Sequence, residues 1–232
     1  MVVYGRNAVR EALRGRRAKT VTEVLATATV ASEAWLAGAP VVRCPPERIA
    51  RACGSSEHQG VCATLAEYPY VGARELLRPS ALIVALDEVQ DPQNLGAICR
   101  TAECAGASGV VICERRASAV TPAVCRASAG AVEHLAIARV GNLAEYLGEA
   151  KRAGLWCYGA AIASGAVAYD GVDYDGAVLL VLGAEGRGLR PRVAASCDAL
   201  VTLPLRGRIG SLNVAAAAAV LLYHVLQRRS RP

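Results

Sequence analysis

The spacing of hydrophobic positions changes near residue 81 of this 232-residue chain. Beyond that point, short continuous apolar runs alternate with segments in which apolar residues recur at helical spacing. Continuous apolar runs are typical of strands that are buried on both faces, and their alternation with helices is typical of parallel sheets. We therefore predict an α/β domain over residues 81–232, with a parallel sheet that helices cover on both faces.

The expected elements of this domain follow from these runs and from the residues that bound them. The strands are ALIVALDEV from Ala81, SGVVICE from Ser108, LAIARV from Leu135, LWCYGAAI from Leu155, AVLLVLG from Ala177 and ALVTLPL from Ala199. The helices are about Asn94 to Ala105, TPAVCRASAGAVEH from Thr121, NLAEYLGEAKRAG from Asn142, RPRVAASC from Arg190, and Leu212 to about Gln227.

Residues 1–68 have a different pattern and predict a small α+β unit. GRNAVREALRG, which ends at Gly15, has the apolar spacing of a helix, and PPERIARAC has prolines where a helix would begin. TVTEVLAT and HQGVCATLAEY are typical of strands. Pro69 and Pro79 bracket a stretch that we expect to be a linker over residues 69–80.

Composition excludes several classes of protein. Hydrophobic residues make up 53% of the chain and charged residues 20%, which argues against disorder. The apolar runs are too short to span a membrane and the N-terminus carries no apolar signal segment, so we expect a soluble, cytoplasmic protein with no membrane partner. The nine cysteines include no C-x-x-C pair and the three histidines lack ligand spacing, so we predict no metal site and interpret the cysteines as small buried residues.

Ligands of open parallel sheets bind beyond the carboxyl ends of the strands, and three loops there carry unusual polar residues. In the first, LDEVQDPQNLGAICRTAECAG, Asn94 and Arg100 lie on a helix made largely of small and apolar residues. Both are candidates for chemistry. A helix cap at Asn94 and a surface charge at Arg100 would explain this loop as well.

The second loop, LVLGAEGRGL, directly follows a buried strand. Gly183, Gly186 and Gly188 would let a ligand approach the backbone closely. The alternative is a dinucleotide-binding loop, but the spacing is G-x-x-G-x-G rather than G-x-G-x-x-G, and no acidic residue follows at the expected distance. Glu185 could bind an amine or cap a neighbouring helix.

The third loop lies in LPLRGRIGSLNVAAAAAVLLYH, which begins at Leu203. Ser211 is a good N-cap for the last helix and would place Asn213 in its first turn. Capping would account for Ser211 but leaves Asn213 unexplained. The alanines from Ala215 to Ala219 allow neighbours to approach closely, so we expect this helix to be packed tightly with its N-terminus facing a ligand.

Together, these loops resemble motifs one, two and three of the SpoU (TrmH-type) RNA ribose 2′-O-methyltransferases of the SPOUT superfamily. DPQNLGAICRTAECAG, LGAEGRGL and LPLRGRIGSLNVAAAAAVLLYH match in order and spacing. VYGRNAVREAL and HQGVCA resemble the small L30e-like RNA-binding domain of the RlmB-like subgroup. The resemblance covers nearly the whole chain.

The resemblance implies a C-terminal domain that contains a trefoil knot, binds S-adenosyl-L-methionine (SAM) and forms a homodimer. The residues implied to be catalytic are Asn94, Arg100, Glu185, Ser211 and Asn213. The positions implied to hold the cofactor, largely through backbone groups, are Gly183, Leu203, Leu205 and Leu212. Leu205 stands where a methionine is commoner in the family.

The implied partner is RNA, and the RlmB-like N-terminal domain favours a guanosine of large-subunit (23S) rRNA. The net charge of +6 comes almost entirely from arginine, which suits RNA phosphates. The candidate backbone contacts are Arg6, Arg10, Arg14, Arg16 and Arg17, although a solvated helix face explains the same arginines. The alternatives are a tRNA substrate, a catalytically silent RNA-binding protein and, more distantly, a dinucleotide-dependent oxidoreductase.

The mechanism proposed for the family gives Arg100 a part in deprotonating the ribose hydroxyl. Arginine stays protonated in proteins, so we expect Arg100 to act as a cation that binds the adjacent phosphate and stabilises the developing alkoxide. The phosphate or water would then accept the proton. Asn94 and Glu185 would orient Arg100 and the ribose, while Ser211 and Asn213 would fix the loop and the nucleotide.

Overall fold

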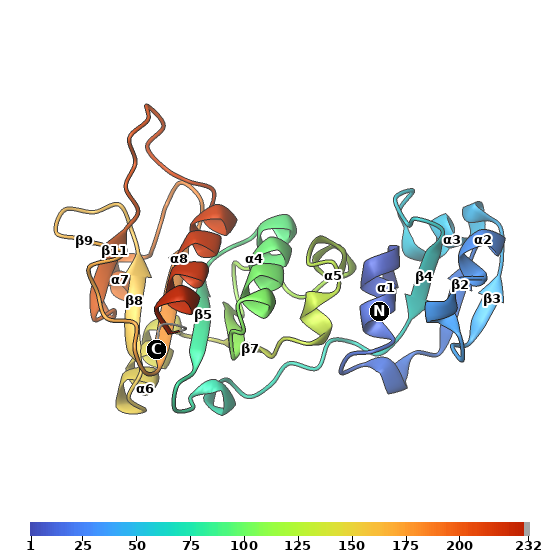
Figure 1. Cartoon of the computed structure of the whole chain (residues 1–232), viewed down its shortest axis with the longest axis horizontal. Helices are drawn as coiled ribbons and strands as arrows, with labels where there is room; N and C mark the ends of the chain where they lie inside the picture. The colour runs from blue at the N-terminus through green and yellow to red at the C-terminus, as the bar shows by residue number, and fades with distance from the viewer. Residues whose placement is uncertain (230–232) are drawn as a thin grey trace. The chain divides into compact units, whose positions relative to one another are not determined.

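A computed structural model of the chain describes residues 1–229. They form two compact units: Met1–Pro69 with Val120–His134, and Tyr70–Ala119 with the chain from Leu135 onward (Figure 1). The chain therefore passes from one unit to the other after residues 69, 119 and 134. Segment 120–134, expected in the C-terminal domain, belongs to the first unit. Most of the expected linker belongs to the second unit, where Leu76 is a core residue.

The second unit is built on a parallel sheet, as the alternating pattern predicts. Its strand order is β7-β6-β5-β10-β8-β11-β9, and all neighbouring strands run parallel. The strands are β5 (Leu82–Asp87), β6 (Gly109–Cys113), β7 (Ile137–Val140), β8 (Trp156–Ala160), β9 (Val167–Ala168), β10 (Val178–Gly183) and β11 (Ala199–Thr202). The predicted α/β class is confirmed. β9 was not predicted because it has two residues, both exposed.

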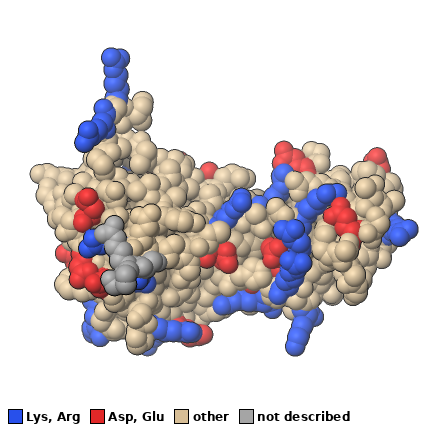
Figure 2. Space-filling model, in the orientation of Figure 1, with Lys and Arg blue, Asp and Glu red and all other residues tan. Residues whose placement is uncertain are grey.

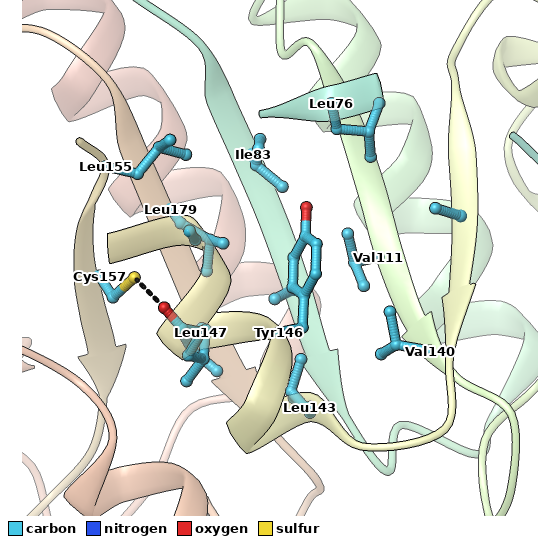
Figure 3. Packing of buried hydrophobic residues seen from close by; sticks show 14 of the residues in the cluster. Leu76, Ile83, Val111, Val140, Leu143, Tyr146, Leu147, Leu155, Cys157 and Leu179 are labelled. Atoms are coloured by element: carbon cyan, nitrogen blue, oxygen red, sulfur yellow. Dashed lines mark hydrogen bonds between the residues drawn. The ribbon is translucent and has the colours of Figure 1, made fainter. Parts of the chain in front are cut away.

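Two helices cover one face of this sheet. α6 (Leu143–Arg152) and α7 (Pro191–Ala195) bury side chains against alternate residues of the central strands. Figure 3 shows Ile83, Val111 and Leu179 of three strands in this cluster, beside the apolar side chains of α6. Successive residues of a strand point to opposite faces of the sheet. The strand residues that alternate with those of this cluster are equally buried and therefore belong to the other face.

The other face is covered by α4 (Pro92–Cys104) and α8 (Val214–Arg229). These helices contact one another, and they also contact β6 and β10 respectively. Ala218 of α8 is fully buried, but Ala216 is exposed and the other alanines of residues 215–219 are partly buried, so within residues 1–229 this helix is packed tightly on one face only. α4 begins before the predicted Asn94, because Asp91 caps it by accepting a hydrogen bond from the Gln93 N–H at 2.9 Å.

The first unit mixes strands and helices, as expected of an α+β unit. Its sheet has the order β1-β4-β2-β3, antiparallel except for the β2–β3 pair. The strands are β1 (Val2–Tyr4), β2 (Glu23–Ala26), β3 (Val41–Arg43) and β4 (Val61–Thr64). The helices are α1 (Arg6–Ala12), α2 (Ala28–Ala31), α3 (Pro46–Cys53) and α5 (Pro122–Ala127).

The single helix expected over residues 121–134 does not form. α5 ends at Ala127, and a separate 3-10 turn follows over Ala131–Glu133. Ala129 and Gly130 lie between them with φ of +52° and +88°, a left-handed conformation that a right-handed helix cannot continue through. The turn also brings this segment close to α1, since a Cβ at Gly130 would lie 2.6 Å from the Cβ of Glu11.

Thiol burial predicts which cysteine reacts first. Cys104, at the end of α4, is exposed, whereas the others are buried or partly buried. Burial raises the pKa of Cys62 and of Cys157 to about 12, so both remain protonated near neutral pH. We expect a short exposure to N-ethylmaleimide to label Cys104 first, as detected by peptide mass spectrometry. Early labelling of Cys62 or Cys157 would contradict this burial.

Candidate active site

A cavity of about 700 Å³ opens at the carboxyl ends of β8, β10 and β11. The loop after β10 and the segment between β11 and α8 form most of its wall, and they carry the second and third polar loops of the sequence. The lining residues are 160–162, 182–188, Val201, Leu203, Leu205, 210–214 and Ala217. This is where an open parallel sheet is expected to bind a ligand.

Glycine is required where the loop after β10 begins. A Cβ on Gly183 would lie 2.2 Å from the carbonyl carbon of Gly188, because the loop folds back over this position. The Gly188 N–H closes the loop by donating to the Ala184 carbonyl at 2.9 Å. Gly186 and Gly188 have φ of +77° and +65°. The glycine spacing thus produces a compact turn that presents backbone groups and Glu185 to the cavity.

Asn213 joins the three polar loops. Its Nδ2 donates to Asn94 Oδ1 at 2.9 Å and to Glu185 Oε1 at 2.5 Å. Its Oδ1 accepts from the backbone N–H groups of Ala215 at 2.9 Å and Ala216 at 3.2 Å. Only this orientation satisfies the side-chain amide, because the flipped amide would place donors against donors. Polar groups from all three motifs therefore meet at Asn213, which lines the cavity.

Asn213, rather than Ser211, caps α8. Hydrogen bonds from a side-chain oxygen to the second and third N–H groups of a helix are those of an N-cap, and α8 begins at Val214. The predicted start of the last helix at Leu212, with Ser211 as its cap, is wrong. Ser211 is instead exposed and lines the cavity.

The structure places most of the predicted site residues together. The positions predicted to hold a cofactor all line the cavity: Gly183, Leu203, Leu205 and Leu212. Among the catalytic candidates, the cavity wall includes Glu185, Ser211 and Asn213, and Asn94 is hydrogen-bonded to it through Asn213. Arg100 is apart from them. Its side chain is exposed on α4, does not line the cavity and makes no hydrogen bond or ion pair within residues 1–229.

Asp87, which the sequence analysis did not single out, anchors the end of the loop after β10. It ends β5 and is 0% exposed. Its Oδ2 accepts from the Arg190 backbone N–H at 2.8 Å, and its Oδ1 accepts from Arg190 Nε at 2.7 Å. This hydrogen bonding raises the pKa of Arg190. The available sequence signal was an acidic residue at the end of an otherwise apolar buried strand.

We expect Asp87→Asn to lower the free energy of unfolding by about 1.5–3 kcal/mol, the usual contribution of hydrogen bonds to charged groups. The amide would turn an N–H donor towards the Arg190 donors, so the loop beside the cavity would loosen and ligand affinity would fall. Urea unfolding measures the stability change. Asp170→Asn is the matched control, because Asp170 is exposed and makes no side-chain hydrogen bond within residues 1–229. Equal unfolding midpoints for the two variants would contradict the anchoring role.

Arg17, proposed from the sequence as an RNA contact, is not available at the surface. It is 1% exposed and forms a buried ion pair with Glu133. Its Nε donates to Glu133 Oε2 at 3.0 Å, its Nη1 donates to the Ala66 carbonyl at 3.0 Å, and its guanidinium lies 5.5 Å from the centre of the Tyr68 ring. A run of arginines gives no sign of this burial, because Glu133 lies 116 residues away in sequence.

The other proposed RNA contacts of the first unit are at the surface. Arg6 and Arg10 are in ion pairs with neighbouring glutamates. Arg14 and Arg16 are exposed and have no side-chain hydrogen bond or ion pair within residues 1–229. Of the five predicted contacts, only these two have no side-chain partner within residues 1–229.

The cavity wall offers backbone groups, leucine side chains, the Glu185 carboxylate and the Arg187 guanidinium, a set suited to an organic ligand. Within residues 1–229, no group of three or more His, Cys, Asp and Glu side chains is arranged to hold a metal ion. In the same part of the chain, no helix combines the length and apolarity needed to cross a membrane.

Two protein-family models match the chain. The SpoU rRNA Methylase family matches residues 81–223, and RNA 2′-O ribose methyltransferase substrate binding matches residues 2–71. YacO of Bacillus subtilis, named for the TrmH family of tRNA/rRNA methyltransferases, is 37% identical over 98% of this chain and 96% of its own length.

Solved structures show the same relationship. An AdoMet-bound rRNA methyltransferase from Sinorhizobium meliloti has a TM-score of 0.82 at 28% identity, covering 100% of this chain and 88% of its own. The TrmH/SpoU tRNA modifying enzyme of A. aeolicus has a TM-score of 0.60 at 28% identity, covering 68% of this chain and 80% of its own. The chain therefore belongs to the SpoU family and is an RNA 2′-O-ribose methyltransferase.

Proposed function

We propose that this enzyme transfers a methyl group from SAM to a ribose 2′-hydroxyl of 23S rRNA at the cavity beside Asn213. The observation that carries the proposal is the hydrogen-bonded set of Asn94, Glu185 and Asn213, which brings the three motifs together on the cavity wall. When bound, SAM supplies a methyl group that its sulfonium charge activates. The protein then has to supply position and electrostatic stabilisation.

The residues of the cavity suit this cofactor. Its volume of about 700 Å³ lies within the usual range for small-molecule sites. Leu203, Leu205 and Leu212 offer apolar surface to a flat base, and the backbone around Gly183 offers hydrogen-bonding groups. The carboxylate of Glu185 suits a ligand that carries positive charge.

In this proposal, Arg100 binds the phosphate next to the target ribose and stabilises the developing alkoxide, because its guanidinium stays protonated. The 2′-oxygen bonds to the methyl carbon as the carbon–sulfur bond breaks, and the hydroxyl proton passes to a phosphate oxygen or to water. Glu185 and Asn94, which Asn213 holds in place, orient the ribose. They orient Arg100 only once RNA is bound, since Arg100 makes no hydrogen bond or ion pair within residues 1–229. Ser211 contacts the nucleotide from the cavity wall.

The share of this chain that each solved relative covers favours ribosomal RNA over tRNA as the substrate. The S. meliloti rRNA enzyme covers all of it, whereas the A. aeolicus tRNA enzyme covers 68%. We therefore assign the chain to the RlmB-like subgroup, with an L30e-like N-terminal domain and a guanosine of 23S rRNA as target. tRNA is the second candidate, because YacO is named for both RNAs. We further propose that the C-terminal part of the chain is knotted and that two copies form a homodimer through it. We also propose that the enzyme acts in the cytoplasm.

The test is methyl transfer from radiolabelled SAM to unmethylated rRNA and tRNA transcripts, with the product mapped by its resistance to alkaline cleavage. We expect a single resistant guanosine in 23S rRNA. Label in tRNA alone would support the second candidate instead. SAM binding without transfer to either RNA would indicate a different RNA target or a missing assembly partner. Absence of SAM binding would overturn the proposal.

A further inference from the structure

The segment between β11 and α8 extends away from the sheet of the second unit (Figure 1). Its sequence, RGRIG over residues 206–210, contains two arginines, two glycines and one isoleucine. Ile209 is 76% exposed, the largest exposed fraction among the large hydrophobic side chains of residues 1–229. An isoleucine so exposed, between arginine and glycine, has no packing role within this chain.

Arg206 and Arg208 are both exposed, and neither makes a hydrogen bond or an ion pair within residues 1–229. Figure 2 shows basic side chains on the extended segment, with no acidic side chain beside them on the visible face. Arg6, Arg10 and Arg126 are each in an ion pair with a glutamate, whereas Arg14 and Arg16 share the unpaired state of Arg206 and Arg208. The charge on the extended segment is therefore not neutralised by the protein.

The same segment also forms the wall of the cavity. Leu205 lines the cavity immediately before Arg206, and Gly210 lines it two residues after Arg208. Side chains at Gly207 and Gly210 would meet no atom within 4 Å, so space surrounds the backbone between the arginines and the cavity. A polyanion that contacts Arg206 and Arg208 would thus pass beside the mouth of the cavity.

We propose that residues 206–209 bind a single-stranded segment of the RNA substrate next to the target nucleotide. Arg206 and Arg208 take backbone phosphates, and Ile209 packs against a base that is not stacked in a helix. Arginine recognises phosphate by charge-assisted, forked hydrogen bonds. Bases in single strands expose apolar faces that a duplex keeps stacked, so the exposed isoleucine favours the single strand. The proposal rests on RNA as the substrate of the proposed function, and it gives these residues a positioning role.

The test compares the double variant Arg206→Gln/Arg208→Gln with the wild type, using a fluorescent single-stranded RNA oligonucleotide and the same strand annealed to its complement. Each arginine is expected to contribute about tenfold to single-strand affinity. The slope of log affinity against log salt concentration should fall by about 1.4, since each single-strand phosphate contact contributes about 0.7. Ile209→Ser should weaken single-strand binding without changing that slope.

The control is Arg152→Gln. Arg152 is exposed at the end of α6, which leads back to the start of β8 and so lies at the edge of the sheet opposite the cavity. It should change neither affinity nor slope. SAM affinity, measured by calorimetry, should be unchanged in all these variants, because the substituted residues do not line the cavity.

Three results would overturn the proposal: unchanged single-strand affinity in the double variant, an equal loss with Arg152→Gln, or a loss confined to the duplex. Failure of the proposed function would be detected by a different measurement, the methyl-transfer assay. In that case the wild type would methylate no RNA, yet the oligonucleotide measurements would still accept or reject the RNA-binding role of residues 206–209.

Discussion

Replacing Arg100 with alanine is expected to reduce methyl transfer by at least about 10²–10³-fold, the usual loss when a donor that stabilises a developing oxyanion is removed. SAM affinity should remain nearly unchanged. Arg100 does not line the cavity and makes no hydrogen bond or ion pair within residues 1–229, so its removal leaves the hydrogen bonds of Asn213 intact. Single-turnover methyl transfer measures the chemical step, and calorimetric titration measures the affinity for SAM.

Two further variants make this result interpretable. Arg100→Lys keeps the positive charge but loses the forked geometry, so its rate should lie between those of the wild type and Arg100→Ala. Arg152→Ala removes an exposed arginine on the opposite side of the sheet and should be as active as the wild type. Loss of SAM binding in Arg100→Ala would mean that Arg100 is a structural residue and would overturn its proposed catalytic role.

Replacing Arg17 with methionine is expected to lower the free energy of unfolding of the first unit by about 3–5 kcal/mol, because it leaves the Glu133 carboxylate buried and unpaired. Glu133 is 1% exposed, so bulk solvent does not reach its carboxylate to replace the lost guanidinium. The partly exposed pair of Arg10 with Glu11 supplies the control. Arg10→Met should change stability by less than about 1 kcal/mol.

The chain allows the two units to be followed separately. It contains two tryptophans, Trp35 in the first unit and Trp156 in the second, and Trp156 is exposed. In a Trp156→Phe background, urea unfolding followed by fluorescence reports on the first unit alone. Arg17→Met/Glu133→Met should recover much of the lost stability, since an apolar pair leaves no buried charge. A loss for Arg17→Met no larger than that for Arg10→Met would contradict the importance of the buried pair.

The strands of the second unit could be predicted because they are buried on both faces and read as continuous apolar runs. β5 and β10, for example, are buried along almost their whole length. The order of the strands could not be predicted, because the apolar residues of a buried strand do not indicate which other strands pair with it. The break at Ala129 was missed because alanine favours helix. The backbone there closes a local C-cap of α5, in which the Gly130 N–H donates to the Cys125 carbonyl and the Ala129 N–H donates to the Arg126 carbonyl.

The candidate site was predictable in composition but not in geometry. The motifs supplied Asn94, Glu185 and Asn213, but only the fold shows that one amide connects them and also caps α8. Ser211 is as good a cap as asparagine by residue type, so local preference could not choose between them. Arg17 and Asp87 were misjudged or missed because their partners, Glu133 and Arg190, lie more than a hundred residues away in sequence.

The chain passes between the two units after residues 69, 119 and 134, and this limits how recombination can exchange the gene segments that encode them. Residues 1–69 could be exchanged by a single recombination event, but the unit they form also needs residues 120–134, which are encoded within the methyltransferase region. A chimaera joined at residue 70 would leave Glu133 without Arg17 and strip the covering from Val124 and Val132, both 0% exposed here. Changes in the substrate-binding module are therefore expected to evolve as two coupled gene segments, and residues 70–232 alone are expected to aggregate.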